Sequence, residues 1–368
     1  MKKTDRRNFL KKAALSGTAV FVMPYIASSW QYISKGLAPG NKQTEFEAGK
    51  TTGYTRANTD WLAKCRYGIG VTWTAQTVPR LGDPLPFQQA VEAFKLKEFV
   101  EQVRHAGADY VLFTATHALQ MLPAPHPVID RLLSDRTCKR DLIGELADAL
   151  AVHGLPLLVY WNHSCNNQDD PEWRKAVGYD GQDKTIFASN LINIVDWMGQ
   201  RYGKKVKAWW FDSSYSLDPR GPYSSVTTDM TSFQFPWERF TVAAKRGFPG
   251  RLVTYNAGIA ETYLYTTHQD YWAGELSNLK APATSRYLHN GLQWFGWTPL
   301  DDRDWVHSKR DTEIPKPLYS DDEVVAFVRA CNNHQAPMTF NLGIYQDGKM
   351  APESIEELRR LGANLKAW

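Results

Sequence analysis

From about residue 60 to the C-terminus, short β-branched or aromatic runs alternate with stretches of helical periodicity. Eight of the runs predict strands: YGIGVTW (67–73), DYVLFTATH (109–117), LPLLVYWN (155–162), KAWWFDSS (207–214), RLVTYNAG (251–258), DYWAGE (270–275), LQWFGWTP (292–299) and PMTFNLGIY (337–345). The helical stretches between and after them cover 94–107, 140–154, 186–203, 236–247, 321–335 and 351–368. Around 270–299 the connecting helices are expected to be weak or missing.

Eight strands that alternate with helices predict a parallel sheet with right-handed crossovers. The length of 61–368 fits one (β/α)8 TIM-like barrel in the α/β class as a single domain, and an open doubly wound sheet is the alternative. The sequence has no G-x-G-x-x-G motif, no P-loop and no internal repeat, so a nucleotide site has little support.

The first 29 residues have the features of an export signal: a basic start, a short apolar stretch and small residues near Ala27 to Ser29. Arg6 and Arg7, followed by Phe9, resemble the bacterial twin-arginine signal, which predicts a periplasmic or secreted protein. The apolar stretch is too short to span a bilayer, so no stable membrane insertion is expected once the signal is removed. Residues 30–60 are polar and predict a tether.

The signal also carries most of the positive charge. Residues 1–28 hold six basic residues and one acid, so their removal changes the formal net charge from +4 to −1. A nearly neutral mature chain has no general attraction for nucleic acid. The four cysteines show no C-x-x-C spacing, which predicts buried thiols, with one disulfide of unassigned pairing as the alternative, and neither a metal nor an organic cofactor is expected.

In a barrel the chemistry lies at the C-terminal ends of the strands. Several expected strands end in side chains that can react or hold a polar ligand: Trp73, His117, Tyr160 to His163, Asp212, Asn256 and Glu275. The chain also has 14 tryptophans and 17 tyrosines, whose flat faces suit either a core or a sugar.

Asp212 ends the apolar run WWFD. Strand side chains alternate in direction, so Trp210 and Asp212 share one face, and Trp209 and Phe211 share the other. If the second pair faces the helices, Asp212 points into the mouth of the barrel, where a carboxylate is costly to desolvate unless it has partners. A surface loop or helix-cap carboxylate is the alternative.

Glycoside hydrolysis needs a second carboxyl group, because one acid attacks or stabilises the anomeric carbon while the other protonates the leaving oxygen. Glu275 is the candidate for that acid. Five other acids compete with it: Asp270, Glu261, Asp301, Asp302 and Asp304.

From about residue 64 onwards the chain resembles the catalytic barrel of the α-L-fucosidases, glycoside hydrolase family 29. The resemblance lies in the order and spacing of KCRYGIGVTW, AGADYVLFTATH, KRDLIGELADAL, LVYWN with PEW, WWFDSS and MTFNLGIYQDGKM. It implies a retaining mechanism in which Asp212 matches the family's nucleophile, while Glu275 is a weaker match to the acid/base. The β-sandwich that commonly follows the family's barrel is not expected here.

Two family histidines are replaced. The first strand ends in Thr72-Trp73 where the family has His-Trp, and His117 is followed by Ala118 where the family has a second histidine. The resemblance implies that the missing imidazoles bind fucose hydroxyls, so a different sugar, or a loss of turnover, is implied.

His117 is expected to contact sugar, with a core histidine as the alternative. The aromatic residues expected to form the walls of the pocket are Trp73, Tyr160, Trp161 and Trp210, with the run LQWFGWTP as another candidate wall, and Asn256 is expected to bind substrate.

The sequence therefore predicts an exported retaining glycosidase that removes a terminal deoxy-sugar or related residue from an extracellular glycan, with no cofactor and with carbohydrate as its partner. A catalytically inactive carbohydrate-binding barrel is the second hypothesis, motivated by the replaced histidines. A cofactor-loaded oxidoreductase is the third, because the twin-arginine route often exports such proteins. The sequence leaves the sugar, the linkage and the oligomeric state open.

Overall fold

The computed structural model describes residues 55–165, 170–222 and 226–366. The expected export signal and most of the expected tether lie outside these residues. The end of that tether is bonded to the domain: the Ala57 amide donates to Asp270 Oδ1 at 2.8 Å, and the Arg56 guanidinium donates to the Asn290 carbonyl at 3.2 Å. The domain's ordered contacts therefore begin a few residues before residue 61.

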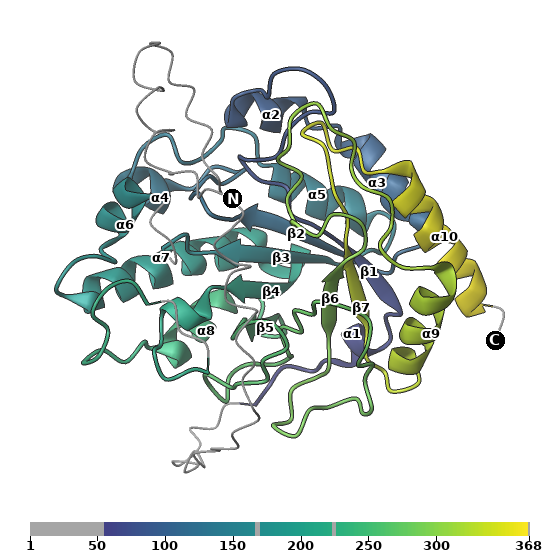
Figure 1. The fold of residues 1–368 in the computed structure, drawn as a ribbon. Helices are drawn as coiled ribbons and strands as arrows, with labels where there is room; N and C mark the ends of the chain where they lie inside the picture. The colour runs from purple at the N-terminus through teal and green to yellow at the C-terminus, as the bar shows by residue number, and fades with distance from the viewer. Residues whose placement is uncertain (1–54, 166–169, 223–225, 367–368) are drawn as a thin grey trace, which may run out of the picture. The chain divides into compact units, whose positions relative to one another are not determined.

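The described residues form a curled, parallel, seven-stranded sheet in the order β5-β4-β3-β2-β1-β7-β6 (Figure 1). Every neighbouring pair is parallel. The strands are β1 (Tyr67–Val71), β2 (Val111–Thr116), β3 (Leu157–Asn162), β4 (Val206–Asp212), β5 (Leu252–Tyr255), β6 (Gly296–Pro299) and β7 (Met338–Asn341). Each lies within, or within one residue of, a run that the sequence predicted as a strand, which confirms the barrel-like α/β class.

The eighth expected strand, 270–275, makes isolated parallel bridges instead of a regular strand. It bridges β6 through Glu275 and Trp297, and it bonds β5 through the Asp270 amide, which donates to the Val253 carbonyl at 2.9 Å. Gly274 explains the irregularity, because its φ is +62° and a Cβ there would lie 1.8 Å from the Phe295 carbonyl oxygen. The segment nevertheless joins the two edge strands of the sheet.

The helices pack outside the sheet (Figure 1), with α7 against α8 on one side and α10 against both α3 and α9 on the other. Those that the sequence predicted are α3 (Leu96–Ala106), α5 (Leu142–Ala151), α7 (Lys184–Tyr202), α8 (Trp237–Ala244), α9 (Asp321–Asn332) and α10 (Pro352–Lys366). Those that it missed are α1 (Asp60–Ala63), α2 (Phe87–Ala93), α4 (Pro127–Leu132) and α6 (Pro171–Val177). No helix occurs in residues 256–295, as expected.

Two apolar clusters lie on opposite faces of the sheet. The inner cluster includes Tyr160 and Trp210, whereas the outer cluster, between sheet and helices, includes Trp209 and Phe211. The Trp209 indole N–H donates to the Ala244 carbonyl of α8 at 2.9 Å. The predicted alternation along β4 is therefore confirmed, and it directs Asp212 to the inner face.

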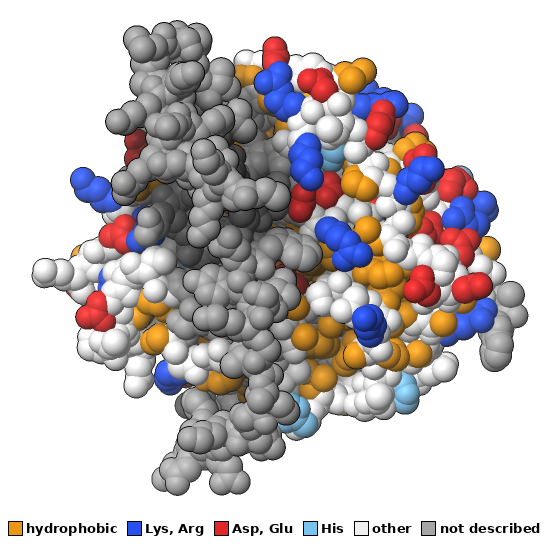
Figure 2. All heavy atoms as spheres, in the orientation of Figure 1, with side chains coloured by type: hydrophobic (Ala, Val, Ile, Leu, Met, Phe, Trp, Pro, Cys, Tyr) orange, Lys and Arg blue, Asp and Glu red, His pale blue; other side chains and the backbone are white. Residues whose placement is uncertain are grey.

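Basic and acidic side chains are interspersed over α3, α9 and α10 on the face shown in Figure 2. All four cysteine thiols are free; three are buried, and Cys65 is half-buried. Within residues 55–366, apart from the two undescribed gaps, no helix is both long and apolar enough to cross a membrane. The same residues contain no group of three or more His, Cys, Asp or Glu side chains placed to hold a metal ion.

Candidate active site

Asp212, the last residue of β4, is surrounded by donors from the neighbouring strands. The Tyr160 hydroxyl donates to Oδ2 at 2.5 Å, and the Asn162 amide donates to the same oxygen at 3.1 Å. The Asn256 amide, just after β5, donates to Oδ1 at 2.9 Å. These partners satisfy a carboxylate that the strand places at the barrel mouth, so Asp212 is not a surface loop carboxylate.

Glu275 lies on the other side of Asn256. The same Asn256 nitrogen, Nδ2, donates to Glu275 Oε2 at 2.7 Å. The two bonds together limit the separation of Asp212 Oδ1 and Glu275 Oε2 to at most about 5.6 Å, close to the spacing of about 5–5.5 Å in retaining glycosidases. Two carboxyl groups from separate strand ends therefore share one amide donor.

The two acids differ in their proton affinity. Burial and the nearby Asp212 raise the pKa of Glu275 to about 7, and the Asn256 hydrogen bond opposes that rise. A carboxyl group with a raised pKa beside a second carboxyl group is the pattern seen where enzymes use one of two carboxyl groups as an acid.

The aromatic residues beneath the acids form a packed floor. The Tyr160 ring stacks on Trp210 at 5.2 Å, and both rings contact Trp297 edge-on at 5.7 and 4.9 Å. Trp210 is buried and donates its indole N–H to the Ala273 carbonyl at 2.8 Å, so it supports Tyr160 from inside the barrel. Burial and Asp212 raise the pKa of Tyr160 well above its usual value, so its hydroxyl remains a donor.

His117 follows β2, and its ring centroid lies 6.1 Å from that of Tyr160. Burial lowers the pKa of its imidazole, although Asp212 opposes the shift. Its Nδ1 is buried and has no hydrogen-bond partner among the described residues. The lowered pKa favours the neutral ring, and Nδ1 is an unused nitrogen close to the Tyr160 ring.

Two of the tryptophans expected to line the pocket, Trp161 and Trp73, pack in the core instead. Trp161 belongs to the outer cluster, because it alternates with Tyr160 along β3 and faces the helices. Trp73 comes two residues after β1 ends, packs on Phe87 and Phe94, and donates its indole N–H to the Gln346 carbonyl at 3.1 Å. Both tryptophans are core residues, so the prediction that they wall a sugar pocket is wrong for this geometry.

The acids that competed with Glu275 have other partners. Asp270 forms a buried ion pair with Lys245 at 2.7 Å. Asp301 accepts from the Ser354 hydroxyl at 2.6 Å and from the Gly343 amide at 2.7 Å.

The remaining competitors form no hydrogen bond to Asp212 among the described residues. Asp302 bonds His307 at 3.2 Å, and Asp304 pairs with Lys309 at 3.0 Å. Burial raises the pKa of Glu261, but no hydrogen bond joins its carboxylate to Asp212.

The sequence placed Asn162 in the strand end 160–163 but gave it no role, although it contacts the Asp212 carboxylate directly. The signal that could have found it is the spacing of two from Tyr160, which puts both side chains on the inner face of β3. Thr72, at the position of one missing histidine, donates to Asn341 Oδ1 at 3.0 Å, and Ala118, at the other, is buried with φ of +57°.

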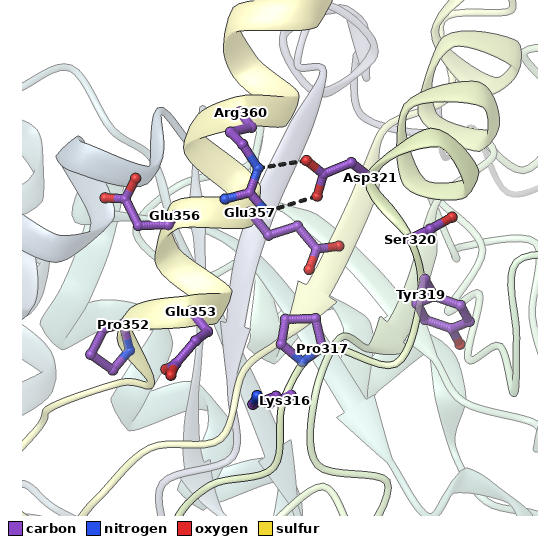
Figure 3. A pocket seen from close by; sticks show the side chains of 10 residues that line it. All are labelled: Lys316, Pro317, Tyr319, Ser320, Asp321, Pro352, Glu353, Glu356, Glu357 and Arg360. Carbon is purple, nitrogen blue, oxygen red and sulfur yellow. Dashed lines mark hydrogen bonds and ion pairs between the residues drawn. The ribbon is translucent and has the colours of Figure 1, made fainter.

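A surface pocket of about 600 Å³ lies away from these acids, between α9 and α10 (Figure 3). Its lining includes Glu357, whose carboxylate points in among the lining residues, and the paired Asp321 and Arg360. None of the residues that contact Asp212 or Glu275 lines it, so its size carries no argument for catalysis there.

The model of the alpha-L-fucosidase family matches residues 85–368 of the sequence. A comparison with curated proteins found no match. Similar solved structures include alpha-L-fucosidase isoenzyme 1 from Paenibacillus thiaminolyticus, with 17% identity over 84% of this chain and 75% of that one and a TM-score of 0.59. The alpha-L-fucosidase AlfC from Lactobacillus casei has 15% identity over 84% and 99%, with a TM-score of 0.57.

The endo-fucoidan hydrolase MfFcnA4, from glycoside hydrolase family 107, has 15% identity over 84% of this chain and a TM-score of 0.60. This chain spans about half of that protein, 53% of its length. At these identities the structural likeness supports the fold, and the sequence match over most of the chain decides the family. The chain belongs to the alpha-L-fucosidase family.

Proposed function

We propose that the protein is an exported, retaining glycoside hydrolase that removes a terminal deoxy-sugar, fucose or a close relative, from an extracellular glycan. The observation that carries the proposal is the bridge from Asp212 through Asn256 to Glu275, with hydrogen bonds of 2.9 and 2.7 Å. Family membership supports the sugar class, and the basic, twin-arginine-like start of the sequence supports export.

In the first step Asp212 attacks the anomeric carbon and forms a glycosyl ester, while Glu275 gives its proton to the leaving glycosidic oxygen. In the second step Glu275, now a carboxylate, takes a proton from water. The water oxygen bonds to the anomeric carbon, and the Asp212 ester bond breaks. Two displacements return the original anomeric configuration, and no cofactor takes part in either.

Glu275 suits the acid role because a carboxyl group with a pKa of about 7 keeps its proton in about half of the molecules at neutral pH, far more than an ordinary glutamate does. Asn256 suits a positioning role, because its Oδ1 accepts a hydrogen bond from the Gly258 N–H at 3.0 Å. That bond fixes the orientation of the side-chain amide, so that its Nδ2 faces the two acids. The Tyr160 hydroxyl and the Asn162 amide hold the other oxygen of Asp212, leaving Oδ1 on the side of Glu275.

His117 is the candidate contact to a sugar hydroxyl. Its neutral ring has an unused nitrogen, and each neutral hydrogen bond to substrate contributes about 0.5–1.5 kcal/mol. The two replaced histidines, at Thr72 and Ala118, remove comparable contacts. The loss changes which sugar binds best more readily than it abolishes chemistry, because both acids remain.

Carbohydrate binding without turnover is the second candidate, favoured by Thr72, whose hydroxyl is bonded to Asn341 instead of facing a ligand as an imidazole donor. Hydrolysis of a panel of aryl glycosides, measured beside calorimetric titration with the free sugars, separates the two. Turnover that disappears in Asp212→Asn, with product released in the starting anomeric configuration by NMR, supports the hydrolase. Binding without turnover of any glycoside supports the second candidate.

A further inference from the structure

His163 is a buried histidine that the proposed mechanism does not use. It follows Asn162 at the end of β3, is only 1% exposed, and packs against the rings of Tyr179 and Phe187. Burial lowers its pKa to about 4, so the ring is neutral. The Cys165 amide donates to Nδ1 at 3.1 Å, and the ring proton is therefore on Nε2.

That Nε2–H donates to the carbonyl of Ser213 at 3.0 Å. Ser213 directly follows Asp212 and has φ of +58° and ψ of +27°, in the left-handed region that a residue with a Cβ rarely adopts. Its carbonyl accepts two more bonds, from the Ser216 hydroxyl at 2.6 Å and the Ser216 amide at 2.9 Å. Its hydroxyl accepts from Asn162 at 2.9 Å.

The direction of the Asp212 side chain depends on this turn. The chain reverses within one residue of Asp212, so a relaxation of Ser213 to ordinary dihedral angles would rotate the end of β4. The Asp212 carboxylate would then leave Tyr160, Asn162 and Asn256, all of which belong to other elements of the barrel. Strain of this kind persists where the surrounding bonds determine it.

We propose that His163 is a positioning residue that fixes the orientation of Asp212 by stabilising the left-handed turn at Ser213, an inference that rests on the catalytic role proposed for Asp212. His163 does not touch substrate, because it is buried behind the turn. Its Nε2 also lies 3.0 Å from the Ser216 hydroxyl, which itself donates to the Ser213 carbonyl, so the effect of His163 on the reaction passes through the turn from Ser213 to Ser216.

The chain supplies a matched control, His126. It is likewise buried with a pKa lowered to about 4, its Nδ1 accepts the Ile129 amide at 3.3 Å, and its Nε2–H donates to the Ile194 carbonyl at 3.1 Å. Those bonds join α4 to α7 and involve none of the residues around Asp212. The two histidines therefore share burial, tautomer, an amide donor at Nδ1 and a carbonyl acceptor at Nε2, whereas His163 Nε2 also contacts the Ser216 hydroxyl at 3.0 Å. They differ in the segment that each one stabilises.

The test compares His163→Phe with His126→Phe in the full-length protein, by unfolding and by steady-state hydrolysis of an aryl glycoside. Both variants should lose similar stability. His163→Phe should lower kcat by about tenfold to a hundredfold with little change in KM, as expected for a misplaced reacting group, and His126→Phe should leave kcat within about twofold. His163→Gln, whose amide can reach the Ser213 carbonyl, should recover most of the rate.

Equal kcat values for the two phenylalanine variants would overturn the proposal, as would a His163→Phe crystal structure in which Ser213 keeps its left-handed dihedral angles and Asp212 its bonds. If His163→Phe does not fold, Ser216→Ala is tested instead. This variant removes one hydrogen bond to the Ser213 carbonyl and should give a smaller fall in kcat. An unchanged kcat would refute the proposal.

A wild-type protein without turnover would refute the proposed function alone. The positioning role is then tested by comparing the pKa of Glu275 in the wild-type protein and in His163→Phe, measured by carbon-13 NMR. If His163→Phe does not fold, Ser216→Ala takes its place. The pKa should fall because the Asp212 charge moves away, and an unchanged value counts against the proposal.

Discussion

Glu275→Gln should make the protein more stable at alkaline pH while abolishing most of its activity. The ordinary pKa of a glutamate carboxyl group is 4.5, and the pKa of Glu275 in the folded chain is about 7. Such a group adds nothing below pH 4.5, where both states are protonated, and it destabilises the folded state increasingly as pH rises to 7 and beyond. The shift corresponds to a loss of about 3 kcal/mol in the free energy of unfolding at about pH 8.

The glutamine amide carries no charge, so the variant avoids this loss. Urea unfolding of both proteins should give equal free energies near pH 4, and a difference of about 3 kcal/mol in favour of the variant near pH 8. In the wild-type protein the alkaline limb of kcat/KM should fall with the same apparent pKa of about 7, because the reaction needs protonated Glu275.

Glu357 offers a matched control on α10, beside the pocket of Figure 3. It is 3% exposed, and burial together with Asp321 raises its pKa to about 7. Glu357→Gln should therefore give a similar gain in stability at alkaline pH without changing kcat. The comparison separates the cost of burying a carboxylate from its use in chemistry.

Two results would refute the reasoning about Glu275. A variant no more stable than the wild type near pH 8 would show that Glu275 is not buried beside Asp212. A variant that gains stability but keeps full kcat would show that another acid protonates the leaving group, with the partly buried Glu261 as the next residue to test.

Three further predictions concern Asp212, Glu275 and the residues that hold them in place. Asp212→Asn should lower kcat by more than about a thousandfold in a folded protein, and it should also lower the pKa of Glu275, both visible in a pH–rate series and by NMR. Asn256→Ala should lower kcat/KM by about tenfold to a hundredfold, from the loss of about 1.5–3 kcal/mol in charged hydrogen bonds, and should raise the pKa of Glu275 further. Asp270→Asn should lower the free energy of unfolding by about 3–5 kcal/mol, because Lys245 loses its buried carboxylate, while kcat of the folded fraction stays the same in active-site-normalised assays.

The fold could be predicted largely because the hydrophobic periodicity of each segment and the residues that end it indicate the same helix or strand. The run that contains β4, for example, ends in Asp212, and the helix preceding it stops near Gly203. The irregularity of segment 270–275 could not be predicted, because its residue types are typical of a strand. The cause is a tertiary contact: Gly274 lies so close to the Phe295 carbonyl that the segment cannot continue as a regular strand. Helix α6 was missed despite a clear start, Asp170 followed by Pro171, because it is short and its apolar residues are few.

The candidate site was predictable where alternation could be counted from a fixed residue. Counting by two from Asp212 gives Trp210, and from Tyr160 it gives Asn162, both on the inner face as observed. Tyr160 and Trp161 could not both line one pocket, since neighbours on a strand face opposite ways, and Trp161 packs under the helices. Trp73 lies beyond the end of β1, where alternation no longer decides direction.

What the sequence could not show is that one amide connects the two acids. Asn256 Nδ2 has two protons and gives one to Asp212 and one to Glu275, while its oxygen accepts from Gly258. Two carboxylates this close repel each other when both are ionised, and burial together with Asp212 raises the pKa of Glu275 to about 7, which favours a proton on Glu275. The first step of a retaining hydrolysis needs that distribution, an ionised nucleophile facing a protonated acid. In the proposed mechanism, the charge repulsion between Asp212 and Glu275 that makes this pair costly to fold also holds the proton that the first step needs.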